Sequence, residues 1–176
     1  MKRYESREAQ LFSIPGFFDG KHYLYCGANK DYHRYIPEIT KWINPYLDVV
    51  EVVPKHQRWC KDSGYFHNVY CQDIIDFIPP KQYDVILMLH IIEHLSLEHA
   101  LEVVGRFKQY TNLLIIAVPW GNVPSMPSGR KVEFPSDNHI TQWQAGELGR
   151  VFKLHDSSVT GQKDIPGNQI LGWWRR

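Results

Sequence analysis

Residues 84–94 read DVILMLHIIEH, and this stretch indicates the class of fold. Residues 84–89 are almost wholly apolar, which is typical of a strand buried on both faces. Residues 113–118, LLIIAV, repeat the pattern. A strand buried on both faces needs helices above and below it, so the two runs predict a mostly parallel sheet covered by helices on both sides.

Strand-like and helix-like segments alternate along the rest of the chain. Five more strands are expected at 23–26, 47–53, 68–71, 153–160 and 169–174, and helices at 31–46, 55–63, 96–107 and 143–152. The third helix is expected to begin at an N-cap, Ser96, and to bury an apolar stripe of Leu97, Ala100, Leu101, Val104 and Phe107. This order predicts an α/β fold, a doubly wound sheet of about seven strands.

The length and composition of the chain limit the number of domains it can form. Its 176 residues (20.7 kDa) correspond to a single domain, 1–176. Within it we expect an amino-terminal cap segment, 1–20, and a long loop on the substrate side, 119–141. The 20 Lys+Arg against 19 Asp+Glu give a net charge of +1, which argues against a nucleic-acid partner.

Targeting signals and cysteines point to a cytoplasmic protein with no membrane partner. The longest apolar run, 113–118, is far shorter than the ~18 residues of a membrane span. Residues 1–10 are charged and lack the apolar region of a signal peptide. Three cysteines without CxxC spacing, Cys26, Cys60 and Cys71, are expected to be reduced thiols.

Polar residues and a glycine follow the expected strands, where open α/β sheets bind ligands. Gly27 would let a ligand approach the backbone, Glu51 would accept hydrogen bonds from ribose hydroxyls, and Asp73 would accept one from an exocyclic amine. Together they indicate a nucleoside. Taken singly, Gly27 is equally a simple turn, Glu51 a solvated strand end, and Asp73 the N-cap of a helical turn at 74–77.

These segments resemble the motifs of one family. They are HYLYCGANK (22–30), DVVEVVPKHQ (48–57), YCQDIIDFIP (70–79), YDVILMLHIIEHL (83–95), LLIIAVPWG (113–121) and NHITQWQAGEL (138–148). In this order they resemble the small, single-domain class I S-adenosylmethionine-dependent methyltransferases, which have a Rossmann-like fold. The resemblance implies methyl transfer with S-adenosylmethionine as cofactor.

The resemblance also implies a cofactor site. Its residues would be Tyr25, Gly27, Ala28, Asn29, Glu51, Val52, Asp73, Ile74, Leu89, His90 and Ile91. The first motif departs from the family pattern, because Tyr25 stands where an acidic residue is usual and Asn29 and Asp31 replace glycines. A methyltransferase-like binding or scaffold protein without turnover is therefore the alternative.

Two histidines are candidates for a catalytic base. His94 follows the fourth strand and His139 ends the long loop, and a neutral imidazole can take a proton from a hydroxyl or an ammonium. The acceptor is expected to be a small molecule or a peptide end, because no residues remain for a separate substrate domain. Its pocket walls would include Trp120, Met126, Phe134 and Trp143, which could equally cover the sheet edge.

Residues 90–94 also spell H-x-x-E-H, the inverted zinc-peptidase signature. The motif adjoins a buried strand and the next helix begins only near Ser96, so His90 and His94 are not expected on one helical face. A third ligand would have to be Glu133 or Glu147, and we expect no metal. Dinucleotide binding is also disfavoured, because residues 27–31 lack the glycine spacing it needs.

Overall fold

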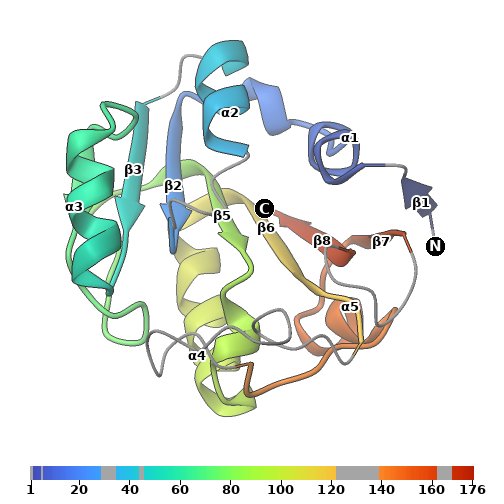
Figure 1. The fold of residues 1–176 in the computed structure, drawn as a ribbon. Helices are drawn as coiled ribbons and strands as arrows, with labels where there is room; N and C mark the ends of the chain where they lie inside the picture. Colours follow the sequence, from blue (N-terminus) through green and yellow to red (C-terminus); the bar gives the residue numbers. More distant parts are fainter. Residues whose placement is uncertain (1, 5, 29–34, 44–45, 122–138, 162–167) are drawn as a thin grey trace, which may run out of the picture.

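The computed structural model describes residues 2–4, 6–28, 35–43, 46–121, 139–161 and 168–176 and contains one eight-stranded sheet (Figure 1). The strands are β1 (Lys2–Tyr4), β2 (His22–Cys26), β3 (Tyr46–Val50), β4 (Asn68–Tyr70), β5 (Tyr83–Leu89), β6 (Thr111–Pro119), β7 (Asp156–Thr160) and β8 (Gln169–Arg175). The helices are α1 (Arg7–Phe12), α2 (Tyr35–Ile43), α3 (Pro54–Asp62), α4 (Leu97–Phe107) and α5 (Glu147–Val151), with short 3-10 helices η1 (Phe17–Asp19), η2 (Ile92–His94) and η3 (Lys108–Tyr110).

The strand order is β1-β7-β8-β6-β5-β2-β3-β4. Strands β4, β3, β2, β5 and β6 run parallel, whereas β8 lies antiparallel between β6 and β7. The predicted α/β doubly wound sheet and its seven strands are confirmed. The eighth strand, β1, is an addition: it lies in the 1–20 segment and pairs with β7, Lys2 opposite Ser158. A three-residue polar strand carries no apolar pattern by which to predict it.

Helices cover both faces of the sheet, as the apolar central strands require. The core beneath α1, α2 and α3 includes Leu11, Ile36, Ile39, Cys60, Leu47, Val85, Leu87 and Ile115. The core beneath α4 and α5 includes Ala100, Val103, Val104, Phe107, Leu148, Leu24, Ile86, Met88 and Ile116. Figure 1 shows α3 and α4 on either side of the sheet. No helix in the described residues has the length and apolar character needed to cross a membrane.

Helix α4 begins as predicted but buries a different stripe. The Ser96 N-cap is confirmed, because its Oγ accepts a hydrogen bond from the His99 amide at 3.2 Å. The predicted stripe is wrong at Leu97 and Leu101, which are 49% and 44% exposed. Val103 is buried instead, so the face toward the sheet follows the i, i+3, i+4, i+7 spacing from Ala100.

A buried carboxylate joins β3 to the beginnings of β4 and β5. Asp48 is 0% exposed and accepts hydrogen bonds from the Tyr83 hydroxyl (2.9 Å) and the Asn68 amide (2.8 Å). Lys81 Nζ lies 2.8 Å from the same carboxylate. Burial, Tyr70 and Asp48 raise the pKa of the Tyr83 hydroxyl, which therefore stays protonated and donates. All the partners a buried carboxylate requires are thus present.

Replacing Asp48→Ala should lower the free energy of unfolding by about 2–3 kcal/mol, because the buried Tyr83 hydroxyl and Asn68 amide lose their acceptor. Lys81→Ala is the matched control and should cost less than about 1 kcal/mol, since the Lys81 side chain is 38% exposed. Urea unfolding measures both. Equal costs for the two variants would show that charge pairing, and not the buried hydrogen bonds, carries the stability.

Candidate functional site

The carboxyl ends of five parallel strands meet at one edge of the sheet. The order reverses between β2 and β5, which is the place where open α/β sheets bind ligands. Backbone hydrogen bonds hold the segments after these strands in line: Gly27 N donates to Val50 O (2.9 Å), Glu51 N to Tyr70 O (3.0 Å) and His90 N to Ala117 O (2.8 Å). Gly27, Glu51 and His90 therefore lie along one edge.

Gly27 is required by its backbone and by a neighbouring side chain. Its φ is +71°, in the left-handed region that favours glycine. A Cβ on Gly27 would lie 1.9 Å from Ile91 Cδ1, so Ile91 fills the space in which a side chain would stand. This packing explains the glycine without a ligand, and a ligand that approached from that side would have to displace Ile91.

Glu51 is held in a fixed position at the end of β3. It is only 5% exposed, and its Oε1 accepts a hydrogen bond from the Val53 amide at 2.7 Å. His56 Nδ1, on α3, lies 4.0 Å from the same oxygen. Gln57 Nε2 donates to the carbonyls of Glu51 and Val52 and fixes the connection to α3. Val52 itself is 42% exposed at this edge.

Asp73 caps a turn, as the simpler interpretation of the sequence has it. Its Oδ1 accepts a hydrogen bond from the Ile75 amide (2.9 Å), and its carbonyl accepts from Asp76 and Phe77. Asp73 is exposed, and the half-buried Ile74 packs against the core beneath α4. The second carboxylate oxygen of Asp73 is not used by this turn.

The other predicted cofactor residues are mostly buried. Tyr25, Ala28 and Leu89 are 3%, 0% and 4% exposed and belong to the core beneath α1, α2 and α3. His90 and Ile91 are half-buried. Asn29 lies outside the described residues, as do Asp31, Met126, Glu133 and Phe134. Among the expected pocket walls, Trp143 is a core residue, 3% exposed and packed on Phe152.

A second group of side chains lies just beyond β5. Glu93 is 1% exposed, and its Oε1 is 3.3 Å from His90 Nδ1 and 4.0 Å from His94 Nε2. The rings of His94 and His139 are 4.9 Å apart. The amides of Ile140 and Thr141 both donate to the Glu93 carbonyl, which brings His139 to this group.

A chain of buried amides orients His90. Gln10 Nε2 donates to Ser158 Oγ (2.8 Å), Gln169 Nε2 donates to Gln10 Oε1 (3.0 Å), and Gln169 Oε1 lies 3.0 Å from His90 Nε2. Because an amide oxygen only accepts, His90 Nε2 carries a hydrogen. His90 Nδ1 faces Glu93 Oε1 at 3.3 Å. His90 also has a φ of +62°, an uncommon conformation for a residue other than glycine.

The environment of Glu93 favours the carboxylate. Burial by itself would raise the pKa of Glu93, but His90, His94 and His139 together outweigh it and hold that pKa below its usual value. Neither carboxylate oxygen accepts a hydrogen bond from any residue that the structure describes. Among the described residues, three imidazoles thus stabilise the Glu93 anion.

Sequence reasoning missed several members of these two groups. His56 gave no signal, since a histidine one turn into a helix has no distinctive spacing. Gln10 lies on α1 and Gln169 on β8, and both are buried. In the sequence, only their apolar neighbours indicated that these two polar side chains are buried. Glu93 was noted only as part of H-x-x-E-H. Glu147, considered as a third ligand there, begins α5 and accepts a hydrogen bond from the Gln144 amide.

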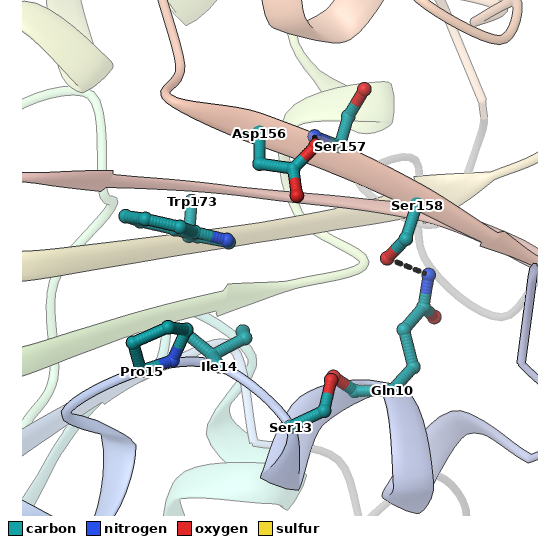
Figure 2. A pocket seen from close by; sticks show the side chains of 8 residues that line it. All are labelled: Gln10, Ser13, Ile14, Pro15, Asp156, Ser157, Ser158 and Trp173. Carbon is teal, nitrogen blue, oxygen red and sulfur yellow. Dashed lines mark hydrogen bonds between the residues drawn. The ribbon is translucent and has the colours of Figure 1, made fainter. Parts of the chain in front are cut away.

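The best-defined cavities of the described residues are small and lie away from Gly27. One, of about 120 Å³, lies between α1 and strands β7 and β8; Figure 2 shows Gln10 reaching across it to Ser158, with Trp173 facing Ile14 and Pro15. The other, of about 180 Å³, is lined by Leu97, Thr141, Gln142, Trp143, Glu147 and Val151. Both are smaller than the roughly 300–1,000 Å³ of a typical cofactor pocket.

The two buried thiols, Cys26 and Cys60, offer no nucleophile in this arrangement. Cys26 and Cys60 are buried and unpaired, and Cys71 is exposed and also unpaired. Burial, with Glu51 and Cys71 nearby, raises the pKa of Cys60 to about 12, so its thiolate is not populated at neutral pH.

Comparison with known proteins identifies the fold. No family model and no curated protein sequence matches the chain. The N-methyltransferase NodS from Bradyrhizobium japonicum WM9 has a similar structure, with a TM-score of 0.68 and 12% identity over 97% of this chain and 94% of NodS. A SAM-dependent methyltransferase from Archaeoglobus fulgidus superposes with a TM-score of 0.63 and 20% identity, covering 86% of this chain and 69% of that one. DhpI, solved as a complex with SAH, gives 0.62 and 11%, covering 87% and 76%. The chain therefore has the fold of class I methyltransferases.

Replacing Gly27→Ala should destabilise the protein by about 1–2 kcal/mol through its positive φ, with about 1 kcal/mol more from the contact with Ile91. Gly64→Ala is the matched control: its φ is +72°, and a Cβ there meets nothing within 4 Å. Urea unfolding of both variants separates backbone strain from packing. In an Ile91→Ala background the cost of Gly27→Ala should fall to that of Gly64→Ala, and an unchanged cost would contradict the packing explanation.

Proposed function

We propose that the chain binds S-adenosylmethionine and transfers its methyl group to a small molecule or a peptide end. The observation that supports this most directly is the buried carboxylate of Glu51 at the end of β3, beside the Gly27 turn, at the point where strand order reverses. The fold is shared with NodS, solved in complex with S-adenosyl-L-homocysteine, and with the DhpI–SAH complex.

In this proposal most of the predicted residues, Tyr25 and Asn29 excepted, have a place around the cofactor. Glu51 accepts hydrogen bonds from the ribose, while the exposed Val52, with Ile74, contacts the adenine and Asp73 accepts from its amine. Gly27, Ala28 and the segment 89–91 surround the methionine part, with Ile91 rotated away from Gly27. The bound cofactor supplies an activated methyl group, so the chain's task is to orient the acceptor and exclude water.

Acceptor recognition falls to residues beside His94 and His139. Either imidazole can take the proton from an acceptor hydroxyl or ammonium, and both border the Glu93 carboxylate, which stabilises the imidazolium that forms. The cavity lined by Leu97, Thr141 and Trp143 begins at the same segment, 139–141. The 1–20 segment and the 119–141 loop, of which residues 122–138 lie outside the described residues, are the remaining candidates for contact with the acceptor.

Binding without turnover is the second candidate, and two observations favour it. Ile91 occupies the space over Gly27, and the family's acidic position holds the buried Tyr25. Both features reduce what the first motif offers to the methionine part of the cofactor. A scaffold or binding protein with this fold would keep the ribose contact of Glu51 and lose the reaction.

Replacing Glu51→Gln should weaken S-adenosylmethionine and S-adenosylhomocysteine binding about 10- to 100-fold, because a charged acceptor for two hydroxyls is lost while the Val53 amide keeps an oxygen partner. Isothermal titration measures both ligands. Glu102→Gln, exposed on α4, removes the same charge and should bind as the wild type does.

Measurements on the wild-type protein distinguish the enzyme from the scaffold. Release of S-adenosylhomocysteine in a screen of small-molecule and peptide acceptors would support the enzyme, whereas binding without any release would support the scaffold. Wild-type protein that binds neither ligand at millimolar concentration would overturn the enzyme and leave a scaffold without cofactor.

A further inference from the structure

Glu93, His94 and His139 form one cluster at the carboxyl end of β5. One ligand atom from each, a carboxylate oxygen or a ring nitrogen, lies within 4.8 Å of the other two. In the described part of the chain this is the one group of three such side chains. The backbone fixes the arrangement, because Ile140 N and Thr141 N donate to the Glu93 carbonyl at 2.8 and 3.0 Å.

The carboxylate of Glu93 points to a ligand. It is 1% exposed, yet neither oxygen accepts a hydrogen bond from the described residues. Leaving a buried polar group without a hydrogen bond costs free energy, and for an anion the cost is larger still. A cation bound to these oxygens would offset this free-energy cost.

We propose that Glu93, His94 and His139 bind one divalent transition-metal ion, with Zn²⁺ as the ion that best suits two imidazoles and a carboxylate. This ligand set is typical of zinc and non-haem iron sites. Ligand atoms about 2.0–2.1 Å from a tetrahedral ion lie about 3.3–3.4 Å apart. The distance from His94 Nε2 to Glu93 Oε1 is 4.0 Å. Side-chain rotations that move these atoms by less than an ångström would bring them to the separation of two ligands on one ion.

His90 supports this site without being a ligand. Its Nε2 is engaged by Gln169 Oε1, and its Nδ1 faces Glu93 Oε1 at 3.3 Å. This contact limits the rotation of the carboxylate, as the partners of metal-bound carboxylates do. The site therefore differs from the H-x-x-E-H zinc peptidases, in which both histidines of the motif are ligands and the glutamate is the base.

Three protein ligands leave one coordination position open, as in catalytic zinc sites. With zinc bound, a water molecule at that position would take the place of His94 and His139 as the base, because the ring nitrogens of both would be bound to the ion. The inference does not rest on the proposed methyl transfer, because the three ligands and the buried carboxylate are independent of any cofactor. Metal binding and cofactor binding can therefore fail separately.

Zinc binding to the purified full chain, first stripped with a chelator, tests the proposal. Titration calorimetry with ZnCl₂ should give one ion per chain, and Co²⁺ should give visible absorption bands of a bound N/O site. Glu93→Gln and His139→Ala should each lower zinc affinity more than about 100-fold, since each removes a ligand. His90→Ala should lower it about 10- to 100-fold, the range for residues that orient ligands.

His99→Ala is the matched control, because His99 is exposed on α4 and its removal should leave zinc affinity unchanged. Thermal unfolding without metal verifies that each variant is folded; should Glu93→Gln fail this check, His139→Ala carries the test, because it leaves the buried Glu93 in place. Zinc binding that is equally tight in His139→Ala and the wild type would overturn the proposal. So would a wild type that takes up no stoichiometric zinc or cobalt.

Discussion

The central strands β2, β5 and β6 are apolar on both faces, and helices pack against each face along their length. A polar side chain in the middle of such a strand would need partners that the core does not contain. Polar chemistry is therefore confined to the strand ends, and the reversal of strand order brings Gly27, Glu51 and His90 to the same edge. The class I methyltransferase fold thus decides where a ligand can bind before any side chain decides which ligand it is.

Two buried carboxylates show how differently the two ends of the sheet are built. Asp48 is satisfied by Tyr83, Asn68 and Lys81, so its environment is complete and its role is structural. Glu93 is as deeply buried but has imidazoles around it and no hydrogen bond from the described residues. A closed network adds stability, whereas an incomplete one offers a binding capacity. The number of hydrogen-bond partners therefore distinguishes Asp48 from Glu93, whereas burial and charge are alike in the two residues.

The sequence predicted the elements that continuous apolar runs define and the N-cap at Ser96, because these depend on local patterns. It missed β1, whose residues pair with β7 without an apolar pattern, and it misplaced the buried face of α4 at Leu97 and Leu101, because several rotations of an apolar helix look alike. For the candidate site it singled out Glu51 and the 90–94 motif but did not connect His139 to Glu93. That contact depends on hydrogen bonds from the amides of Ile140 and Thr141 to the Glu93 carbonyl. Such long-range hydrogen bonds cannot be predicted from the spacing of residues along the chain. The packing of Ile91 on Gly27 was likewise beyond a local pattern.

The pairing of β1 with β7 joins residues at opposite ends of the sequence, and β7 reaches the rest of the sheet through β8. Contacts so distant along the chain form late in folding, and an edge strand of three residues is the first to fray. The same edge carries Ser158, from which the amides of Gln10 and Gln169 lead to His90. Local opening of this edge would therefore release the amides that orient the His90 imidazole beside Glu93.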